Sequence, residues 1–142
     1  MESETTKKRI NQKQIIMIEW YKKVVLENYA NFNGRARRAE YWWYSLGNLI
    51  LFIIAAVLDS VIGLAILGPY GIFYTVLLLG TIIPSIAVGI RRMHDVGKSG
   101  WFILIPIYNL ILACTEGDKG SNEYGPDPKN QYDEVNKLGT DY

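Results

Sequence analysis

The chain has 142 residues, of which 49% are hydrophobic and 20% are charged, and its formal net charge is +1. These totals are ordinary for one soluble domain, but the apolar and charged residues are segregated along the chain. Between residues 44 and 90 the only charged side chain is Asp59, and residues 101–115 contain none. Apolar runs of about 18 residues or more predict transmembrane helices, which excludes a soluble globular class. The single cysteine, Cys114, excludes an intramolecular disulfide.

The N-terminal part contains two kinds of segment. Residues 1–13 are polar and lack periodicity, which predicts a mobile tail. Residues 14–30 have an apolar, aromatic face and an opposite face that carries Glu19, Lys23 and Glu27. Such an amphipathic helix lies in the membrane interface or packs on the ends of other helices, and both alternatives stay open. The first apolar run begins more than forty residues into the chain, so we expect a retained anchor and no cleavable signal peptide.

The stretch NFNGRARRAEYWWY, residues 31–44, places three arginines directly before an aromatic belt: Arg35, Arg37 and Arg38. Basic residues followed by an aromatic belt mark the cytoplasmic edge of a span. We predict a first span at about 45–67, an uncharged turn at 68–71 and a second span at 72–90. Nine basic residues precede the first span and the turn has none, so the positive-inside rule places the N-terminus in the cytoplasm.

The third apolar run, residues 101–115, is short. Its 15 residues would form only about 22 Å of helix, against a hydrocarbon core of about 30 Å, and Pro106 with Asn109 interrupts it. It is either a short tilted span or a re-entrant hairpin that turns at 105–109 and returns to the cytoplasm. We favour three membrane-inserted segments, the last of them irregular.

The stretch RRMHDVGKSGW, residues 91–101, allows two interpretations. In the first, the stretch is a polar site at the membrane surface. His94 would transfer protons near neutral pH, or Arg91 and Arg92, with Lys98 nearby, would bind an anionic headgroup. The same residues also describe a helix end, with cations in the last turn and a glycine stop. His94 and Asp95 point about 100° apart on a helix, so they are not a ready catalytic pair. Because two Arg-rich clusters face each other, Glu40, Asp95 or lipid phosphate is expected between them.

Asp59 lies within the first apolar run, and a carboxylate inside a membrane usually suggests a functional site. Asp59 lies close to the outer end of the first span, however, which favours snorkelling or helix capping over ion conduction. Small residues at helical spacing suit close helix packing: Ala56, Ser60, Ser85 and Gly89. Whether the chain forms a homo-oligomer stays open. The sequence has no metal-ligand spacing, nucleophile elbow or nucleotide fingerprint, and its basic residues are mostly juxtamembrane, which argues against nucleic acid.

Three stretches, NFNGRARRAEYWW, RRMHDVGKSGW and GSNEYGPDP, stand in this order and are separated by apolar runs. Together they resemble the small bacterial inner-membrane proteins grouped as domain of unknown function family eight hundred and five. The resemblance covers residues 17–129 and implies a bacterial cytoplasmic-membrane protein with both Arg-rich motifs cytoplasmic. It implies no known activity. Family members often begin near Met17, an alternative start, so residues 1–16 are expected to be an extension; residues 101–115 are short for the family.

We therefore predict an all-α integral membrane protein with an amphipathic interfacial helix, two full transmembrane helices and a short, irregular third membrane segment. Residues 31–115 form the membrane domain, and residues 116–142 form an acidic tail containing glycine and proline.

The leading functional hypothesis is a non-enzymatic protein without cofactor or metal. It would bind anionic phospholipid or another membrane protein through its two Arg-rich motifs. The alternative is a small transporter or channel subunit in which Asp59 and His94 line a polar path. A membrane enzyme that uses His94 and Asp95 ranks below both.

Overall fold

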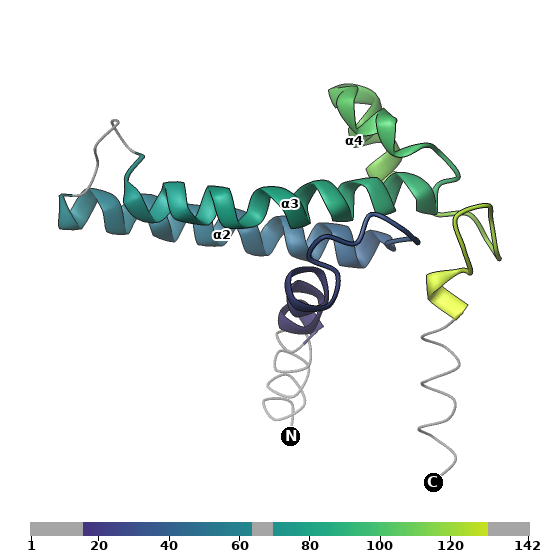
Figure 1. Cartoon of the computed structure of the whole chain (residues 1–142), viewed down its shortest axis with the longest axis horizontal. Helices are drawn as coiled ribbons and strands as arrows, with labels where there is room; N and C mark the ends of the chain where they lie inside the picture. Colours follow the sequence, from purple (N-terminus) through teal and green to yellow (C-terminus); the bar gives the residue numbers. More distant parts are fainter. Residues whose placement is uncertain (1–15, 64–69, 131–142) are drawn as a thin grey trace, which may run out of the picture. The chain divides into compact units, whose positions relative to one another are not determined.

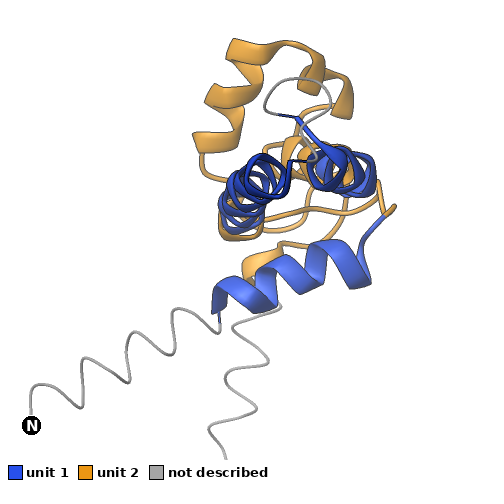
Figure 2. Ribbon diagram, turned by 90° about the vertical axis from the view of Figure 1, so that its left-hand side faces the viewer, with its two compact units in different colours: residues 1–29, 42–85 blue, residues 30–41, 86–142 orange. Residues whose placement is uncertain are grey.

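The computed structural model of the chain describes residues 16–63 and 70–130. Regular structure in these two ranges is helical, without an extended strand, which confirms the all-α prediction (Figure 1). The predicted tail at 1–13, the end of the first predicted span at 64–67, the first half of the turn at 68–71 and the chain after residue 130 lie outside the described residues. Two compact units divide the chain: unit 1 consists of residues 1–29 and 42–85, and unit 2 of residues 30–41 and 86–142 (Figure 2).

The two predicted spans correspond to two long helices, α2 (Arg38–Ile62) and α3 (Ile72–Asp95), which run side by side in Figure 1. Both are long and apolar enough to cross a membrane, with mean hydropathies of 2.2 and 2.0. Helix α2 begins seven residues before the predicted Ser45, because the arginine and aromatic stretch is itself helical. It ends before Gly63, whose φ of +76° suits a helix stop.

Helix α3 extends five residues beyond its predicted end at Ile90. Its last turn closes with hydrogen bonds from the N–H of Gly97 to the His94 carbonyl (3.0 Å) and from the N–H of Lys98 to the Met93 carbonyl (3.0 Å). Gly97 has a φ of +69°, so this is the glycine stop that the sequence indicates. The Arg-rich residues after the second span are therefore part of the helix.

Pro84 interrupts the hydrogen-bond ladder of α3. Proline has no N–H, so the carbonyl four residues earlier, that of Gly80, loses its helical donor. The hydroxyl of Tyr29 donates to this carbonyl at 2.7 Å. A side chain of the N-terminal segment thus satisfies a backbone group that hydrocarbon would leave without a partner.

Residues 16–22 are α-helical and continue into the π-helical turn η1 (Lys23–Glu27). Within unit 1 this helix packs on α2: the Tyr21 ring stacks on Tyr44 at 5.3 Å and its hydroxyl donates to Asn48 Oδ1 at 2.9 Å. A Cβ at Gly47 would lie 2.8 Å from the Tyr21 ring, so glycine permits this approach. Burial raises the pKa of Tyr21, with a further contribution from Tyr44. The described contacts correspond to the packed alternative, while Leu26 stays 74% exposed.

The third apolar run contains two short helices, η2 (Gly100–Leu104) and α4 (Pro106–Cys114). They are separated by Ile105, which is extended, and Pro106 is the first residue of α4, where the missing N–H is harmless. Both ends of this run lie beside the end of α3, since Lys98 bonds to Met93 and the N–H of Asp118 donates to the Asp95 carbonyl at 2.7 Å. Because both ends of the run lie at the same end of α3, the described residues match the re-entrant hairpin and not the short tilted span.

Candidate functional site

Unit 2 contains a buried charge cluster, which we define as Arg35, Glu40, Arg91, Arg92 and Asp95. Each of these residues is at most 8% exposed. The five residues come from the loop before α2, the first turn of α2 and the last turns of α3, and the chain that follows α4 supplies carbonyl acceptors. Buried ions are tolerated only when they are paired and hydrogen-bonded, so the partners decide what the cluster does.

Arg35 joins the loop before α2 to the C-terminal segment. Its Nε donates to Asp95 Oδ1 at 3.0 Å, and its Nη1 donates to the carbonyl of Gly120 at 2.6 Å. Its Nη2 donates to the carbonyl of Asp118. The side chain is 1% exposed, so no face of it is left for an external anion.

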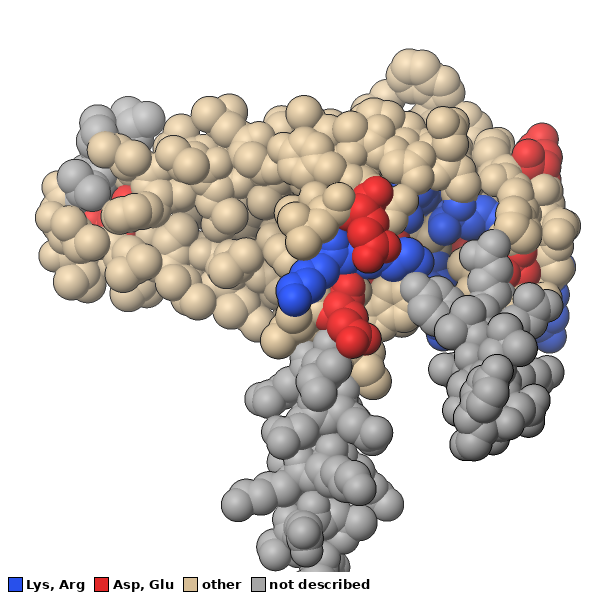
Figure 3. Space-filling model, turned by 60° about the horizontal axis from the view of Figure 1, so that its bottom comes forward, with Lys and Arg blue, Asp and Glu red and all other residues tan. Residues whose placement is uncertain are grey.

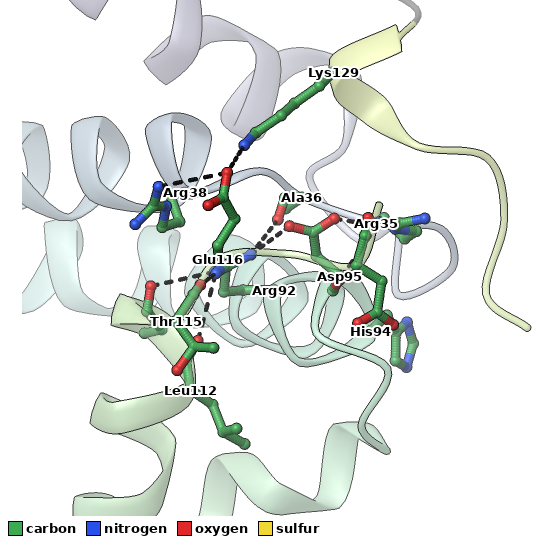
Figure 4. Close-up of polar contacts among 12 residues, drawn as sticks. Arg35, Ala36, Arg38, Arg92, His94, Asp95, Leu112, Thr115, Glu116 and Lys129 are labelled. Carbon is green, nitrogen blue, oxygen red and sulfur yellow. Dashed lines mark hydrogen bonds and ion pairs between the residues drawn. The ribbon is translucent and has the colours of Figure 1, made fainter. Parts of the chain in front are cut away.

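Arg92 ties α4 to the end of α3 (Figure 4). It pairs with Asp95 and donates to the carbonyls of Leu112 (3.4 Å), Ala113 (3.3 Å) and Thr115. A guanidinium has five N–H donors in a rigid fork, which suits this cage of one carboxylate and several carbonyls. Arg92 is 0% exposed and connects the two helices through hydrogen bonds inside the protein.

Arg91 and Glu40 form the third ion pair of the cluster, with 2.6 Å between Nη1 and Oε1. The backbone contributes as well, because the N–H of Ala36 donates to the Arg91 carbonyl at 3.0 Å. The three pairs place Glu40 and Asp95 between the Arg-rich stretches, as expected from charge alone. Two carboxylates balance two of the three positive charges, and backbone carbonyls provide further acceptors to Arg35 and Arg92, so each of the three arginines has a partner within the protein.

His94 does not approach the Asp95 carboxylate in this cluster. Its Nδ1 lies 3.0 Å from the Gly34 carbonyl, and its ring stacks on Tyr124 at 4.0 Å with an angle of 2°. The side-chain amide of Asn122 donates to the His94 carbonyl at 2.9 Å. The imidazole is consequently fixed in orientation, and Nδ1 carries a hydrogen because only a donor satisfies the Gly34 carbonyl.

The acidic residues of the C-terminal segment are also engaged internally. Asp127 accepts from the N–H groups of Gly120 (3.0 Å) and Lys129 (2.9 Å). Burial alone would raise the pKa of Asp127, but these hydrogen bonds and the charge of Arg35 outweigh it and lower the pKa. Glu116 pairs with Lys129 at 2.6 Å. Among residues 16–63 and 70–130, no group of three or more His, Cys, Asp or Glu could hold a metal ion.

The remaining predicted residues are at the surface or in unit 1. Arg38 has a side chain that is 45% exposed and donates to the Cys114 carbonyl at 3.3 Å. Arg37 is half-buried, and Lys98 is exposed. Asp59 is 0% exposed and caps α3, accepting from the N–H groups of Phe73 (3.0 Å) and Tyr74 (2.9 Å). Capping is therefore its observed role, which the sequence favoured.

Sequence reasoning identified the carboxylates of Glu40 and Asp95 but missed the backbone acceptors of the arginines. Most of these are carbonyls of residues 112–125, and carbonyls have no sequence signature. The only available signal was the glycine-rich GDKGSNEYG stretch, in which Gly120 and Gly125 have φ values of +74° and +136°.

The same end of α3 borders a pocket of about 370 Å³. Its walls are Ile86, Ile90 and His94 on α3, and residues 99–101, 103 and 104 on the following turn. Two glycines let these walls approach: a Cβ at Gly100 would lie 2.7 Å from Ile90 Cγ2, and one at Gly89 would collide with Ile103. The close contact of these walls thus depends on the two glycines.

Comparison with known proteins places this arrangement in a family. Residues 29–126 match the family described as "Protein of unknown function (DUF805)". The chain is 44% identical over 119 residues to inner membrane protein YhaI of Escherichia coli K12, covering 79% of this chain and 97% of that protein. It is 40% identical to inner membrane protein YhaH of the same strain, covering 79% and 98%. No solved structure matches significantly. The predicted resemblance is confirmed, and the chain belongs to the DUF805 family of integral membrane proteins.

Proposed function

We propose that this protein is a non-enzymatic component of the bacterial cytoplasmic membrane whose Arg-rich end faces the cytoplasm and binds anionic phospholipid headgroups. The division of labour among the five motif arginines supports the proposal. Arg35, Arg91 and Arg92 are buried in unit 2, whereas the Arg38 side chain is 45% exposed and lies 4.0 Å from the exposed Glu116, and Arg37 is half-exposed. The buried charge cluster fixes the loop that ends at Arg37 and the first turn of α2, which begins at Arg38.

The surroundings of Arg37 and Arg38 suit the headgroup layer. They directly precede the aromatic belt, in which Trp42 is 40% exposed. On the face drawn in Figure 3 the left-hand part of the molecule is almost entirely tan, and the charged side chains gather in the middle and on the right. Basic residues at such an edge gain about 1 kcal/mol each from an anionic leaflet, which corresponds to about fivefold in affinity.

The test uses the full chain in phosphatidylcholine vesicles and measures, by electron spin resonance, how strongly spin-labelled phosphatidylglycerol is preferred over spin-labelled phosphatidylcholine. We expect a preference for phosphatidylglycerol in the wild type and a several-fold weaker one in Arg37→Gln/Arg38→Gln. The control Lys7→Gln/Lys8→Gln removes the same charge elsewhere and should retain the preference. Charge reversal at Arg91 and Arg92 is unsuitable, because it would break the internal cluster.

An unchanged preference in the Arg37/Arg38 variant would overturn the proposal. If cross-linking in native membranes then showed a neighbouring protein that this variant loses, the two arginines would belong to a protein interface instead.

A further inference from the structure

The pocket beside His94 is polar at one end and apolar at the other. His94 lies in the last turn of α3, and Ser99 lies just beyond that helix. Ile86 is eight residues before His94, about 12 Å along the helix at 1.5 Å per residue. Between these ends the lining is Ile90, Ile103, Leu104 and Trp101. Such a gradient matches a molecule with a polar head and a hydrocarbon chain.

From this gradient we propose that the pocket holds one acyl chain of an anionic glycerophospholipid, with the phosphate beside His94 and Ser99 and the chain along Ile86 and Ile90. This site is separate from Arg37 and Arg38 and does not depend on the function proposed for them.

The charges around the mouth favour an anionic head. Lys98 is exposed next to Ser99, whereas the carboxylate of Asp95 is turned inward to Arg35 and Arg92. The exposed carboxylate of Asp118 lies beside Gly97 and accepts from the Asn122 amide at 3.1 Å. Basic pockets bounded by membrane helices are common sites for phospholipid headgroups.

His94 is preorganised for such a contact. The Gly34 carbonyl engages its Nδ1 and Tyr124 stacks on its ring, so Nε2 is the nitrogen left for a ligand, and it donates to a phosphate oxygen when the ring is doubly protonated. Holding a recognition group in one orientation lowers the entropy lost on binding. A residue serving only as a helix end would not require both contacts.

The open side of the pocket suits a chain that arrives from the bilayer. Trp101 is 79% exposed and Leu104 is 69% exposed. Ile86, at 43%, belongs to a helix long and apolar enough to span the membrane. In a membrane these side chains face hydrocarbon, so an acyl chain reaches the pocket without crossing water.

Native mass spectrometry of the full chain, extracted from vesicles of equal phosphatidylglycerol and phosphatidylcholine, tests this site. We expect one phosphatidylglycerol to be retained in preference to phosphatidylcholine. Ile86→Trp and Leu104→Trp fill the pocket from two walls, and each should lower that occupancy at least fivefold. Ile83→Trp and Ile107→Trp add the same ring at exposed positions outside the pocket, 40% and 78% exposed, and should keep the lipid.

Ile86→Trp and Leu104→Trp fill the pocket from different walls, so one of them still tests the site if the other fails to fold. Equal retention of the two lipids by the wild type, or equal phosphatidylglycerol occupancy in filled and control variants, would overturn the proposal. Arg37→Gln/Arg38→Gln should leave this tightly held lipid in place. Loss of the lipid in that variant, with the pocket variants unaffected, would assign it to the arginine surface and refute the pocket.

Discussion

Several side chains in this protein form hydrogen bonds with backbone groups that have no partner within their own helix. Arg92 satisfies carbonyls at the end of α4, and Asp59 satisfies two N–H groups at the start of α3. The Tyr29 hydroxyl donates to the Gly80 carbonyl, which lacks a helical donor because Pro84 has no N–H. Each of these groups would be costly to leave unpaired away from water, which explains why polar residues lie within apolar elements.

The Tyr29 contact predicts a non-additive pair of substitutions. Tyr29→Phe should lower the free energy of unfolding by about 1 kcal/mol, because the Gly80 carbonyl loses its donor. In a Pro84→Ala background the new N–H reaches the Gly80 carbonyl, so the same substitution should cost much less. Unfolding in mixed micelles with increasing dodecyl sulfate measures all four proteins. Equal costs in both backgrounds would contradict this account.

At the scale of elements, the packing of η2 on α3 depends on glycine. A Cβ at Gly100 would meet Cγ2, Cγ1 and Cβ of Ile90 at 2.7, 3.2 and 3.4 Å, and a branch at Cβ cannot rotate away. Gly100→Ala should therefore destabilise the protein by about 1–3 kcal/mol. Gly80→Ala is the matched control, since a Cβ added at Gly80 would meet nothing within 4 Å. Thermal unfolding in detergent compares them, and an equal melting temperature for both would refute the packing argument.

The elements also show what local sequence patterns predict. Hydropathy located α2 and α3, and Pro106 located the break before α4, because these signals lie within the elements themselves. The 15-residue run fitted both a span and a hairpin, since length alone does not say where its ends go. The buried charge cluster was predicted only as a need for counter-ions. Its geometry joins Arg35 to Gly120, 85 residues away, and depends on tertiary packing.

On the scale of the whole molecule, the hairpin determines the number of membrane crossings. Two spans, followed by a segment that returns to the end of α3, give an even number, so the C-terminal segment should share a side with the loop before α2. The positive-inside rule predicts that this side is the cytoplasm. If residues 100–114 crossed the membrane, the carbonyls of Leu112 and Thr115 would lie on the side opposite Arg92, and neither hydrogen bond could form.

Single cysteines in a Cys114→Ser background test this topology with a membrane-impermeant maleimide on right-side-out and inside-out vesicles. Asn33→Cys and Ser121→Cys, both at exposed positions, should react only in inside-out vesicles. Tyr70→Cys, between α2 and α3 and 50% exposed, should react only in right-side-out vesicles. If Ser121→Cys instead followed Tyr70→Cys, the third segment would cross the bilayer. The Arg92 cage would then require a different chain arrangement, because its donors and acceptors would lie on opposite sides of the membrane.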